Sequence, residues 1–484
     1  MAVKFIFILI FLLFSCSTCA FSREDEDVAV VVPATIKLHL KPRFSGQKQG
    51  DKQSVVDSAT RDLARIKALQ TRKQSKNENP ISSLGKDEER SESELYSTGF
   101  SGQLVATLAS GASLGSGEYF IDVFMGTPPK HFSLILDTGS DLNWIQCVPC
   151  YECFEQNGPY YDPKGSTSFK NVTCKDPRCQ LVSSPNPPLP CKAQNQSCPY
   201  VYWYGDTSNT TGDFALEAFT VNLTTTTGKS EFRKVENVMF GCGHWNRGLF
   251  HGAAGLLGFG RGPLSFPSQL QSLYGSSFTY CLVDRSSNIS VSSKLIFGEN
   301  KDLMNHPELN FTSLVERKKN QDDTFYYLQI KSIVVGGEVL KIPETTWELS
   351  KEGGGGTIID SGTTLSYFAE AGYKVIKEAF TKKVKSYPIV KDIRLLDPCY
   401  NMSGVEKLDF PSFGIQFADG AVWNFPVDNY FIWLEPGEVM CLAILRTPLS
   451  DMSIIGNFQQ QNFQVLYDTE NSRLGFAPAN CAEV

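Results

Sequence analysis

The stretch Leu-Ile-Leu-Asp-Thr-Gly-Ser at residues 134–140 decides the fold, because it returns as Thr-Ile-Ile-Asp-Ser-Gly-Thr at residues 357–363. In each copy an apolar or β-branched run precedes the Asp-Thr/Ser-Gly triplet, which predicts a strand that ends in a tight turn. Two apolar residues and a glycine follow downstream of each copy, at residues 256–258 and 454–456. The aspartate and this glycine are 121 residues apart in the first half and 96 in the second. The internal repeat therefore predicts two related lobes.

A pseudo-twofold axis between two such lobes would place Asp137 and Asp360 face to face. Two carboxylates about 3 Å apart cannot both ionise comfortably, so the pair shares one proton. One carboxylate can then act as the base that activates water, while the other acts as an acid toward a carbonyl oxygen. This chemistry needs no metal ion and no cofactor. A single Asp-Thr-Gly would be an ordinary turn, but two copies in matched surroundings predict a catalytic pair.

From residue 119 onward, short β-rich runs alternate with Gly, Pro, Asn and Asp, and this pattern predicts a mainly β fold. Examples of these runs are residues 119–124, 133–136, 325–335 and 463–467. One helix is expected at residues 371–384, where apolar residues recur along one face. The chain has 484 residues and a net charge of −7, which argues against a nucleic-acid-binding protein.

The first twenty residues have the layout of a secretory signal peptide. Lys4 precedes an apolar run of ten residues, Phe5 to Phe14, and small residues at positions 18–20 offer a cleavage site. A membrane anchor is the alternative, but this run is too short to span ~30 Å of hydrocarbon. We therefore expect export without a membrane anchor, either to the extracellular or cell-wall space or to the vacuole.

The counts of cysteines and of glycosylation sequons agree with export. An even number of cysteines follows residue 20, and in an exported chain this predicts six disulfides. These twelve cysteines are Cys147, Cys150, Cys153, Cys174, Cys179, Cys191, Cys198, Cys242, Cys281, Cys399, Cys441 and Cys481. The run Cys147-x-x-Cys150-x-x-Cys153 could instead hold a metal ion or cluster, but no histidine lies nearby. Glycosylation is expected at seven Asn-x-Ser/Thr sites: Asn171, Asn195, Asn209, Asn222, Asn288, Asn310 and Asn401.

Residues 21–110 contain no cysteine, and from Lys37 to Lys76 they carry eleven Lys or Arg against three Asp. The rest of the chain, residues 111–484, carries 30 basic and 39 acidic residues. We therefore expect a basic prosegment that the acidic body holds near its cleft at neutral pH and releases on acidification. A passive disordered tail is the alternative. A short helix is indicated within the prosegment by apolar residues at helical spacing: Leu63, Ile66 and Leu69.

With both aspartate motifs in place, the chain resembles the pepsin-type aspartic endopeptidases, and among them the plant nepenthesin-like group with its extra cysteines. The resemblance covers residues 119–484. It implies a bilobal double-β fold with an active cleft between two lobes related by a pseudo-twofold axis. It also implies a monomeric enzyme that hydrolyses peptide bonds of protein substrates at acidic pH, with Asp137 and Asp360 as its catalytic pair.

The resemblance also implies roles for the residues around the aspartates. Support of the two active loops would come from Thr138, Gly139, Ser140, Ser361, Gly362 and Thr363. Thr138 and Ser361 would lock the loops together, while Ser140 and Thr363 would hydrogen-bond the outer carboxylate oxygens. Tyr204 and Gly205 would belong to a flap that closes over bound peptide, with Trp144 packed behind that flap.

From these features the chain is expected to divide into a signal peptide at 1–20, a basic prosegment at 21–110, an N-terminal lobe at 111–310 and a C-terminal lobe at 311–484. Residues 147–198 resemble the cysteine-rich insertion of the group. The family pattern implies the pairs Cys147–Cys150, Cys153–Cys242, Cys174–Cys198, Cys179–Cys191, Cys281–Cys481 and Cys399–Cys441.

Two other functions compete with proteolysis. Some exported proteins of this fold bind and inhibit polysaccharide hydrolases, but they typically lack an intact aspartate pair or flap, whereas both are present here. A serine hydrolase is suggested by Gly-Ala-Ser-Leu-Gly at residues 111–115. That motif requires a strand before it and a helix after it, and a Gly/Ser-rich stretch ahead of an expected strand offers neither.

Overall fold

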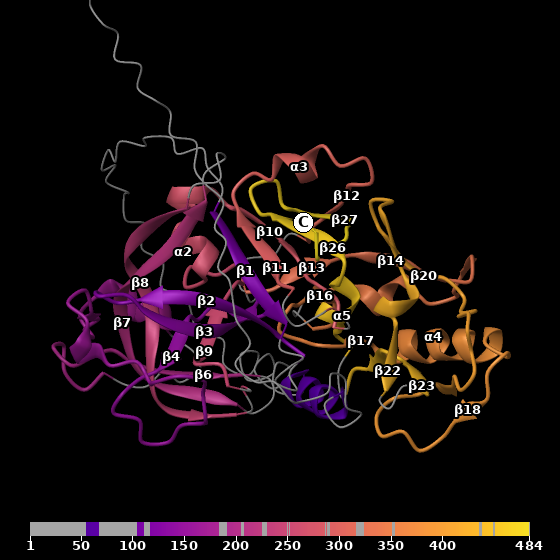
Figure 1. Cartoon of the computed structure of the whole chain (residues 1–484), viewed down its shortest axis with the longest axis horizontal. Coiled ribbons are helices and arrows are strands. Elements are labelled where there is room, and N and C mark those ends of the chain that lie inside the picture. The colour runs from indigo at the N-terminus through magenta and orange to yellow at the C-terminus, as the bar shows by residue number, and fades with distance from the viewer. Residues whose placement is uncertain are drawn as a thin grey trace, which may run out of the picture. The chain divides into compact units, whose positions relative to one another are not determined.

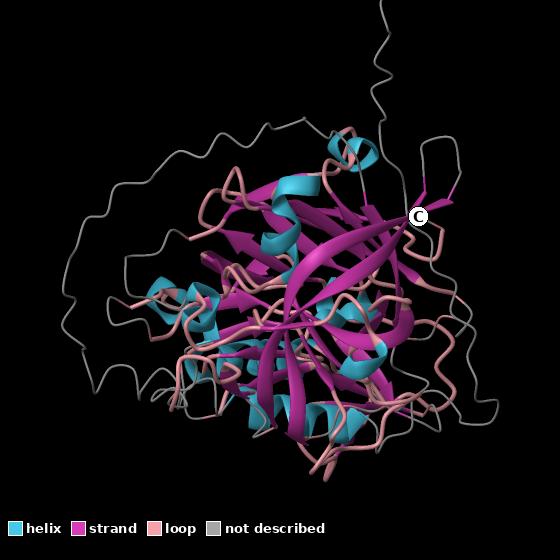
Figure 2. Ribbon diagram, turned by 90° about the vertical axis from the view of Figure 1, so that its left-hand side faces the viewer, coloured by secondary structure: helices cyan, strands magenta, loops and turns pink. Residues whose placement is uncertain are grey.

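A computed structural model describes residues 55–66, 104–110, 117–182, 191–204, 208–224, 230–248, 250, 252–285, 287, 291–315, 324–350, 354–434, 438–448 and 451–483. The expected signal peptide lies outside these residues, as do Leu69, Gly205 and Asn288. Strands predominate over helices in the described part of the chain (Figure 2), so the prediction of a mainly β fold is confirmed.

The largest sheet contains fourteen strands of the described chain, in the order β12-β27-β26-β10-β11-β1-β2-β3-β9-β4-β8-β7-β5, with β6 paired to β7. Its strands are β1 (Leu104–Ser110), β2 (Tyr119–Met125), β3 (Lys130–Asp137), β4 (Trp144–Gln146), β5 (Lys170–Asn171), β6 (Pro199–Trp203), β7 (Asn209–Thr224), β8 (Ser230–Arg247), β9 (Gly255–Gly258), β10 (Ser277–Cys281), β11 (Ser293–Phe297), β12 (Asn310–Ser313), β26 (Phe463–Asp468) and β27 (Arg473–Pro478). Most of these strands come from the first half of the described chain (Figure 1).

The second half of the chain forms three smaller sheets within the described residues. A five-stranded sheet has the order β13 (Tyr326–Leu328), β16 (Thr357–Ile359), β25 (Ser453–Ile455), β17 (Ser366–Phe368) and β24 (Ile444–Arg446). One four-stranded sheet has the order β15 (Glu338–Val339), β14 (Ile330–Val335), β20 (Phe413–Phe417) and β21 (Val422–Phe425). The other has the order β18 (Ile389–Val390), β19 (Cys399–Asn401), β23 (Val439–Leu442) and β22 (Phe431–Leu434).

Helices are short, apart from α4 (Glu370–Lys383) and a helix at residues 55–66, which we call the N-terminal helix. The others are α2 (Phe266–Tyr274), α3 (Lys301–Met304), α5 (Asn457–Gln460) and the 3₁₀ turns η2 (Pro163–Gly165), η3 (Pro177–Val182), η4 (Glu344–Trp347) and η5 (Val427–Asn429). Helix α4 confirms the expectation at 371–384, and it buries Ile376 and Phe380 on its apolar face. In the described residues, no helix combines the length and apolar character needed to cross a membrane.

The sequence repeat corresponds to a structural repeat. Strand β3 pairs in parallel with β9, and β16 pairs in parallel with β25, so each aspartate loop lies beside an apolar-apolar-Gly strand. The glycines of these strands are required by close packing. A Cβ atom at Gly258 would lie 2.4 Å from the backbone of Asp141, and one at Gly456 would lie 2.3 Å from the carbonyl oxygen of Leu365. In each repeat, the glycine therefore packs directly against the backbone that follows the aspartate turn.

The end of the chain returns to the large sheet. Strand β26 pairs antiparallel with β10 over Ser277–Cys281, and the pair lies side by side in Figure 1. A disulfide between Cys281 and Cys481, whose Cα atoms are 5.3 Å apart, joins the same two regions. The last strands of the chain thus complete the sheet that the first strands begin.

Candidate active site

The two aspartates occupy equivalent positions in the structural repeat. Asp137 is the last residue of β3, and Asp360 directly follows β16. Each strand is buried toward its end, so each carboxyl group is carried into the interior, and both aspartates are 0% exposed. We call these two residues the aspartate pair.

Each carboxylate is held by the same two kinds of donor. Gly139 N donates to Asp137 Oδ1 over 3.0 Å, and Ser140 Oγ donates to Asp137 Oδ2 over 2.6 Å. In the other loop, Gly362 N donates to Asp360 Oδ1 over 2.9 Å, and Thr363 Oγ1 donates to Asp360 Oδ2 over 2.6 Å. The family resemblance implied these contacts for Ser140 and Thr363, and the structure places both hydroxyls there.

The residues that follow the aspartates join the two loops across the repeat. Thr138 N donates to Ser361 Oγ over 3.0 Å, and Ser361 N donates to Thr138 Oγ1 over 2.8 Å. Both side chains are fully buried. Because each hydroxyl satisfies a backbone N–H of the opposite loop, the distance between the two loops is fixed by four polar groups with no access to water.

Glycine is required at the third position of both motifs. A Cβ atom at Gly362 would lie 2.2 Å from Asp137 Oδ1, and one at Gly139 would lie 2.7 Å from Asp360 Oδ1. Each glycine therefore lets the opposite carboxylate approach. The two motif glycines are what allow the aspartate pair to face each other closely.

The electrostatics of the aspartate pair follow from its burial. Burial raises the pKa of the Asp360 carboxyl above its ordinary value, and the negative charge of Asp137 raises it further. The guanidinium of Arg65 acts in the opposite direction and lowers this pKa. Together, burial and the neighbouring charge favour the protonated form of Asp360.

Tyr204 and Trp144 are brought together beside the aspartate pair. Trp144 Nε1 donates a hydrogen bond of 2.6 Å to the hydroxyl of Tyr204, and both side chains are buried. Tyr204 follows β6, and its backbone N–H bonds to the carbonyl of Ser208 across the hairpin that leads into β7. Gly205 lies outside the described residues, so its expected place in the flap stays a prediction.

An arginine of the N-terminal helix contacts both aspartates. Arg65 Nη2 lies 2.6 Å from Asp137 Oδ1 and 3.0 Å from Asp360 Oδ2, and its side chain is 11% exposed. The sequence predicted a basic segment near the cleft but did not single out this residue. Helical spacing places Arg61 and Arg65 on one face of the helix, but it does not indicate which basic residue of the segment contacts an aspartate.

Two more charged residues of the N-terminal helix anchor it. Arg61 Nη1 pairs with Glu118 Oε1 at 2.5 Å. The carboxylate of Asp62 accepts hydrogen bonds from the backbone N–H groups of Thr364 and Leu365, each over 3.0 Å. These two amides come directly after the second active loop, so the helix packs beside that loop. Arg61, Asp62 and Arg65 line one cavity together with Tyr204 and Gly362.

Apolar contacts complete the docking of the N-terminal helix. Val55, Ala59 and Ile66 are buried in one apolar cluster with residues of the five-stranded sheet, such as Ile358 and Tyr367. The hydroxyl of Tyr367 also donates to the carbonyl oxygen of Ala59 over 3.0 Å. A helix is confirmed at Leu63 and Ile66, whereas Leu69 lies outside the described residues. Its contact face also includes Val55, Ala59 and Asp62, which the sequence did not single out.

Comparison with known proteins now bears on this site. A family model described as xylanase inhibitor N-terminal matches residues 119–299, and one described as xylanase inhibitor C-terminal matches residues 325–478. Aspartyl protease family protein 2 of Arabidopsis thaliana is 38% identical over 382 residues, which are 79% of this chain and 74% of that protein. Aspartic proteinase nepenthesin-2 of Nepenthes gracilis is 39% identical over 371 residues, 76% of this chain and 78% of that protein.

The chain belongs to the aspartic protease family. Solved structures agree on the fold of the protease. The structure of edgp aligns with a TM-score of 0.65 at 21% identity and covers 79% of this chain and 96% of its own. Basic 7S globulin from soybean aligns with a TM-score of 0.62 at 21% identity, over 78% and 97% of the two chains. The predicted bilobal, pepsin-like β fold is thus confirmed, and as an aspartic protease the enzyme acts on proteins or peptides.

The protease contains six disulfides in its described residues, and two of the expected pairs are correct, Cys281–Cys481 and Cys399–Cys441. The expected pairs Cys147–Cys150 and Cys153–Cys242 are wrong, because the structure pairs Cys147 with Cys242 and Cys150 with Cys153. The reason is strand pairing. Strand β4 runs parallel to β8 with Ile145 opposite Cys242, and this register brings Cys147, directly after β4, within 5.3 Å of Cys242 between Cα atoms.

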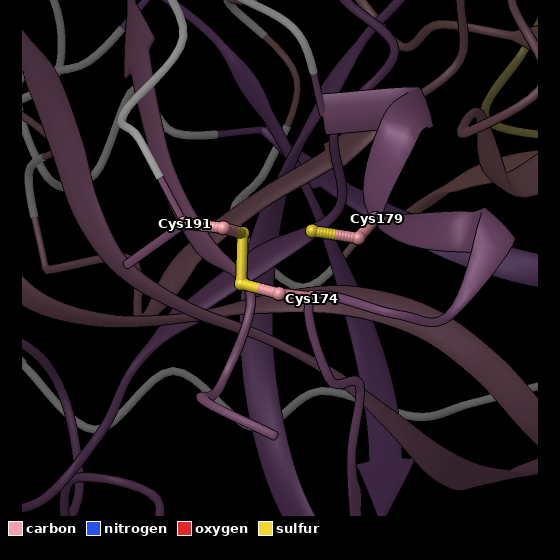
Figure 3. Close-up of side chains that lie close together, drawn as sticks. All are labelled: Cys174, Cys179 and Cys191. Carbon is pink, nitrogen blue, oxygen red and sulfur yellow. A yellow bond between two sulfur atoms is a disulfide. The ribbon is translucent and has the colours of Figure 1, made fainter. Parts of the chain in front are cut away.

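Two more expected pairs in the insertion are exchanged. The structure joins Cys174 to Cys191 and Cys179 to Cys198, instead of Cys174 to Cys198 and Cys179 to Cys191. Turn η3 places Cys179 over Cys198, and their Cα atoms are 5.7 Å apart. The sulfur atoms of Cys174, Cys179 and Cys191 lie within 4.8 Å of one another (Figure 3). Because all three are oxidised into disulfides, their proximity does not make a thiolate site.

Most of the expected glycosylation sites fall in described strands and turns. Asn171, Asn195, Asn310 and Asn401 are exposed, and Asn209 is half-buried. Asn222 belongs to β7. Occupancy of these sites stays a prediction.

Proposed function

We propose that the protease is an exported aspartic endopeptidase that cleaves protein substrates at acidic pH through a water molecule activated by Asp137 and Asp360. The observation that carries this proposal is the matched set of hydrogen bonds on the two buried carboxylates. They leave each carboxylate oriented toward the other with its outer oxygen already bonded to a hydroxyl. Two carboxylates held in this way can share a proton and a water molecule.

The roles of the two aspartates follow from their surroundings. Asp360 carries the proton, because burial raises its pKa. Asp137 then accepts a proton from water, the hydroxide attacks the peptide carbonyl carbon, and the carbonyl oxygen takes the proton of Asp360. In the resulting tetrahedral intermediate, Asp137 passes the proton that it took from water to the nitrogen, and one hydroxyl of the intermediate returns a proton to Asp360. The C–N bond then breaks, which gives a carboxylic acid and an amine. Activity in acid is expected, since the reaction needs one carboxyl group neutral.

We also propose that the chain is made as a latent precursor. In support, Arg65 occupies the space between the aspartates, and Asp62 binds two amides beside the second active loop. Both side chains therefore fill positions that a substrate peptide would need. The N-terminal helix must leave before cleavage can begin, and the ion pairs of Arg65 with the aspartates weaken when acid protonates their carboxylates.

The processed enzyme provides the test of catalysis. Asp137→Asn and Asp360→Asn should each lower the rate of peptide cleavage at pH 4 by about 10³-fold or more. Asp302→Asn is the matched control, since this exposed aspartate of α3 lies outside the site. An inhibitor that mimics the tetrahedral intermediate should block the wild type. Retention of wild-type rates by either variant of the aspartate pair would reject the proposal.

A binding function is the second candidate, because the matching family models carry the description xylanase inhibitor. The intact aspartate pair and the Trp144–Tyr204 contact favour proteolysis. If the purified, processed protein bound a xylanase and cleaved no member of a peptide library, the binding function would replace the catalytic one.

A further inference from the structure

The hairpin that carries Tyr204 has two different faces. Tyr202 and Thr210 are buried on the inner face, together with Asn246 of the neighbouring strand β8. The alternate residues of the same strands point outward, and among them Trp203 is 48% exposed. A large indole exposed on a protease hairpin is a surface that another group can cover.

Asn209 lies directly opposite this indole. Strands β6 and β7 pair antiparallel with Trp203 in register with Asn209. Residues opposite each other in such a pair have Cβ atoms about 4.5–5.5 Å apart and share one face of the sheet. The side chains of Trp203 and Asn209 therefore project from the sheet side by side.

Asn209 also begins a glycosylation sequon, Asn209-Thr210-Thr211. A sugar attached to its side chain would extend outward from the sheet at the height of the indole ring. The ring offers a flat apolar surface, and the C–H face of a sugar ring is apolar enough to lie on it. The strand register alone thus places a sugar attached at this sequon beside the exposed tryptophan.

The other neighbour of Asn209 supplies polar groups. Asn209 pairs with Arg247 of β8, whose Nε lies 2.5 Å from Glu152 Oε1. A charged pair on this side can bond the hydroxyl or acetamide groups of a sugar. The next exposed tryptophan of the sheet, Trp245, is already stacked on Tyr151 with ring centroids 4.7 Å apart.

We propose that the N-glycan of Asn209 packs its first N-acetylglucosamine on the indole of Trp203. In this arrangement, the outer face of the flap hairpin binds the chain's own glycan and is covered by it. This contact covers apolar surface next to Tyr204 and stiffens the hairpin that holds the flap. The inference rests on occupancy of Asn209, which the first measurement determines, and it does not depend on catalysis.

The test uses the full chain secreted from a eukaryotic host, with Asp137→Asn in every form to prevent self-digestion. Thr211→Ser keeps the sequon, whereas Thr211→Ala removes it and leaves Asn209 in place. Glycopeptide mass spectrometry first establishes occupancy. Hydroxyl-radical footprinting then compares oxidation of Trp203 with that of Trp433, which is 38% exposed in the second half of the chain.

A sugar on one face of an indole covers about half of its exposed surface, so oxidation of Trp203 should be roughly twofold slower with the sequon than without it. Trimming the glycan to its first sugar with an endoglycosidase should preserve this protection. Oxidation of Trp433 should be equal in all forms. An unmodified Asn209, or equal oxidation of Trp203 in the Thr211→Ser and Thr211→Ala forms, would overturn the proposal.

A second measurement separates the contact from a general effect of glycosylation. The sequon should raise the thermal midpoint by on the order of 1–2 °C when Trp203 is present and by less in a Trp203→Ala background. Equal stabilisation in both backgrounds would mean that the glycan acts without the indole, and the proposal would fall.

Discussion

Arg65 Nη2 lies 2.6 Å from Asp137 Oδ1, so a positive charge of the N-terminal helix is bonded to the carboxylate that we assign as the base. The same nitrogen reaches Asp360 Oδ2 at 3.0 Å. One guanidinium therefore contacts both aspartates, and in the proposed mechanism it would have to leave before water could bind between them.

Replacing Arg65 should unlock the precursor. In the unprocessed chain, Arg65→Gln should raise the initial rate of peptide cleavage by at least about tenfold, because a buried charge pair is lost from the docked state. The initial rate of Arg65→Lys should lie between those of the wild type and Arg65→Gln, because lysine keeps the positive charge but lacks the planar guanidinium group. The control is Thr60→Ala, at an exposed position of the same helix. Unchanged latency in Arg65→Gln would contradict the assignment.

Asp62 should stabilise the docked N-terminal helix more strongly in acid than at neutral pH. Burial raises its pKa to about 7 in the docked helix, whereas a released helix would have the ordinary value near 4. The docked form therefore binds a proton between about pH 4 and 7, and this contribution to docking is lost as pH rises through 7. Acid release must accordingly come from other groups, such as Asp360, whose pKa the docked Arg65 lowers.

This argument is tested with Asp62→Ala in the unprocessed chain. The substitution should raise the initial rate by a factor that is about tenfold or more larger at pH 5 than at pH 7.5. Thr60→Ala again serves as the control, assayed at both pH values. An effect of equal size at the two pH values would show that Asp62 does not take up a proton on docking.

The mutual contact of Thr138 and Ser361 should matter for both stability and rate. Thr138→Ala leaves the buried N–H of Ser361 without its acceptor, so the free energy of unfolding should fall by about 1–3 kcal/mol. The turnover number should fall as well, because the loops lose their fixed spacing. Thr138→Ser keeps the hydroxyl and should stay close to wild type. Urea titration and steady-state kinetics of the processed enzyme measure both quantities.

Tyr204→Phe should lower kcat/KM by about tenfold, since the buried indole N–H of Trp144 loses its acceptor and the hairpin that we expect to act as the flap loses this contact. Tyr200→Phe removes a hydroxyl from the same hairpin, where Tyr200 contacts Thr210 at 2.8 Å, and provides the control. A wild-type kcat/KM in Tyr204→Phe would show that the hydrogen bond between Trp144 and Tyr204 does not contribute to catalysis.

Disulfide mapping of a non-reduced digest should find Cys147 linked to Cys242 and Cys150 linked to Cys153. Peptides that link Cys153 to Cys242 instead would contradict the register of β4 against β8. The result would also show whether strand pairing or local spacing determines the bonds of the insertion.

The active loops were predictable from sequence because each carries its chemistry in a contiguous motif, and duplication of that motif excluded chance. The disulfides of the insertion were not predictable in the same way. Their pairing depends on which strands become neighbours, and Cys147 and Cys242 are 95 residues apart. The contact of Arg65 with the aspartates was not predictable for a related reason. Nothing in the local sequence distinguishes Arg65 from the other basic residues among the eleven of its segment.

The return of β26 to β10 has a consequence for how the protease folds. Strand β10 begins at Ser277, whereas its partner β26 begins at Phe463. Contacts between segments so far apart in sequence form slowly, because the long intervening loop must close before the strands can pair. We therefore expect a folding intermediate in which this edge of the main sheet is still open while the smaller sheets of the second half have formed.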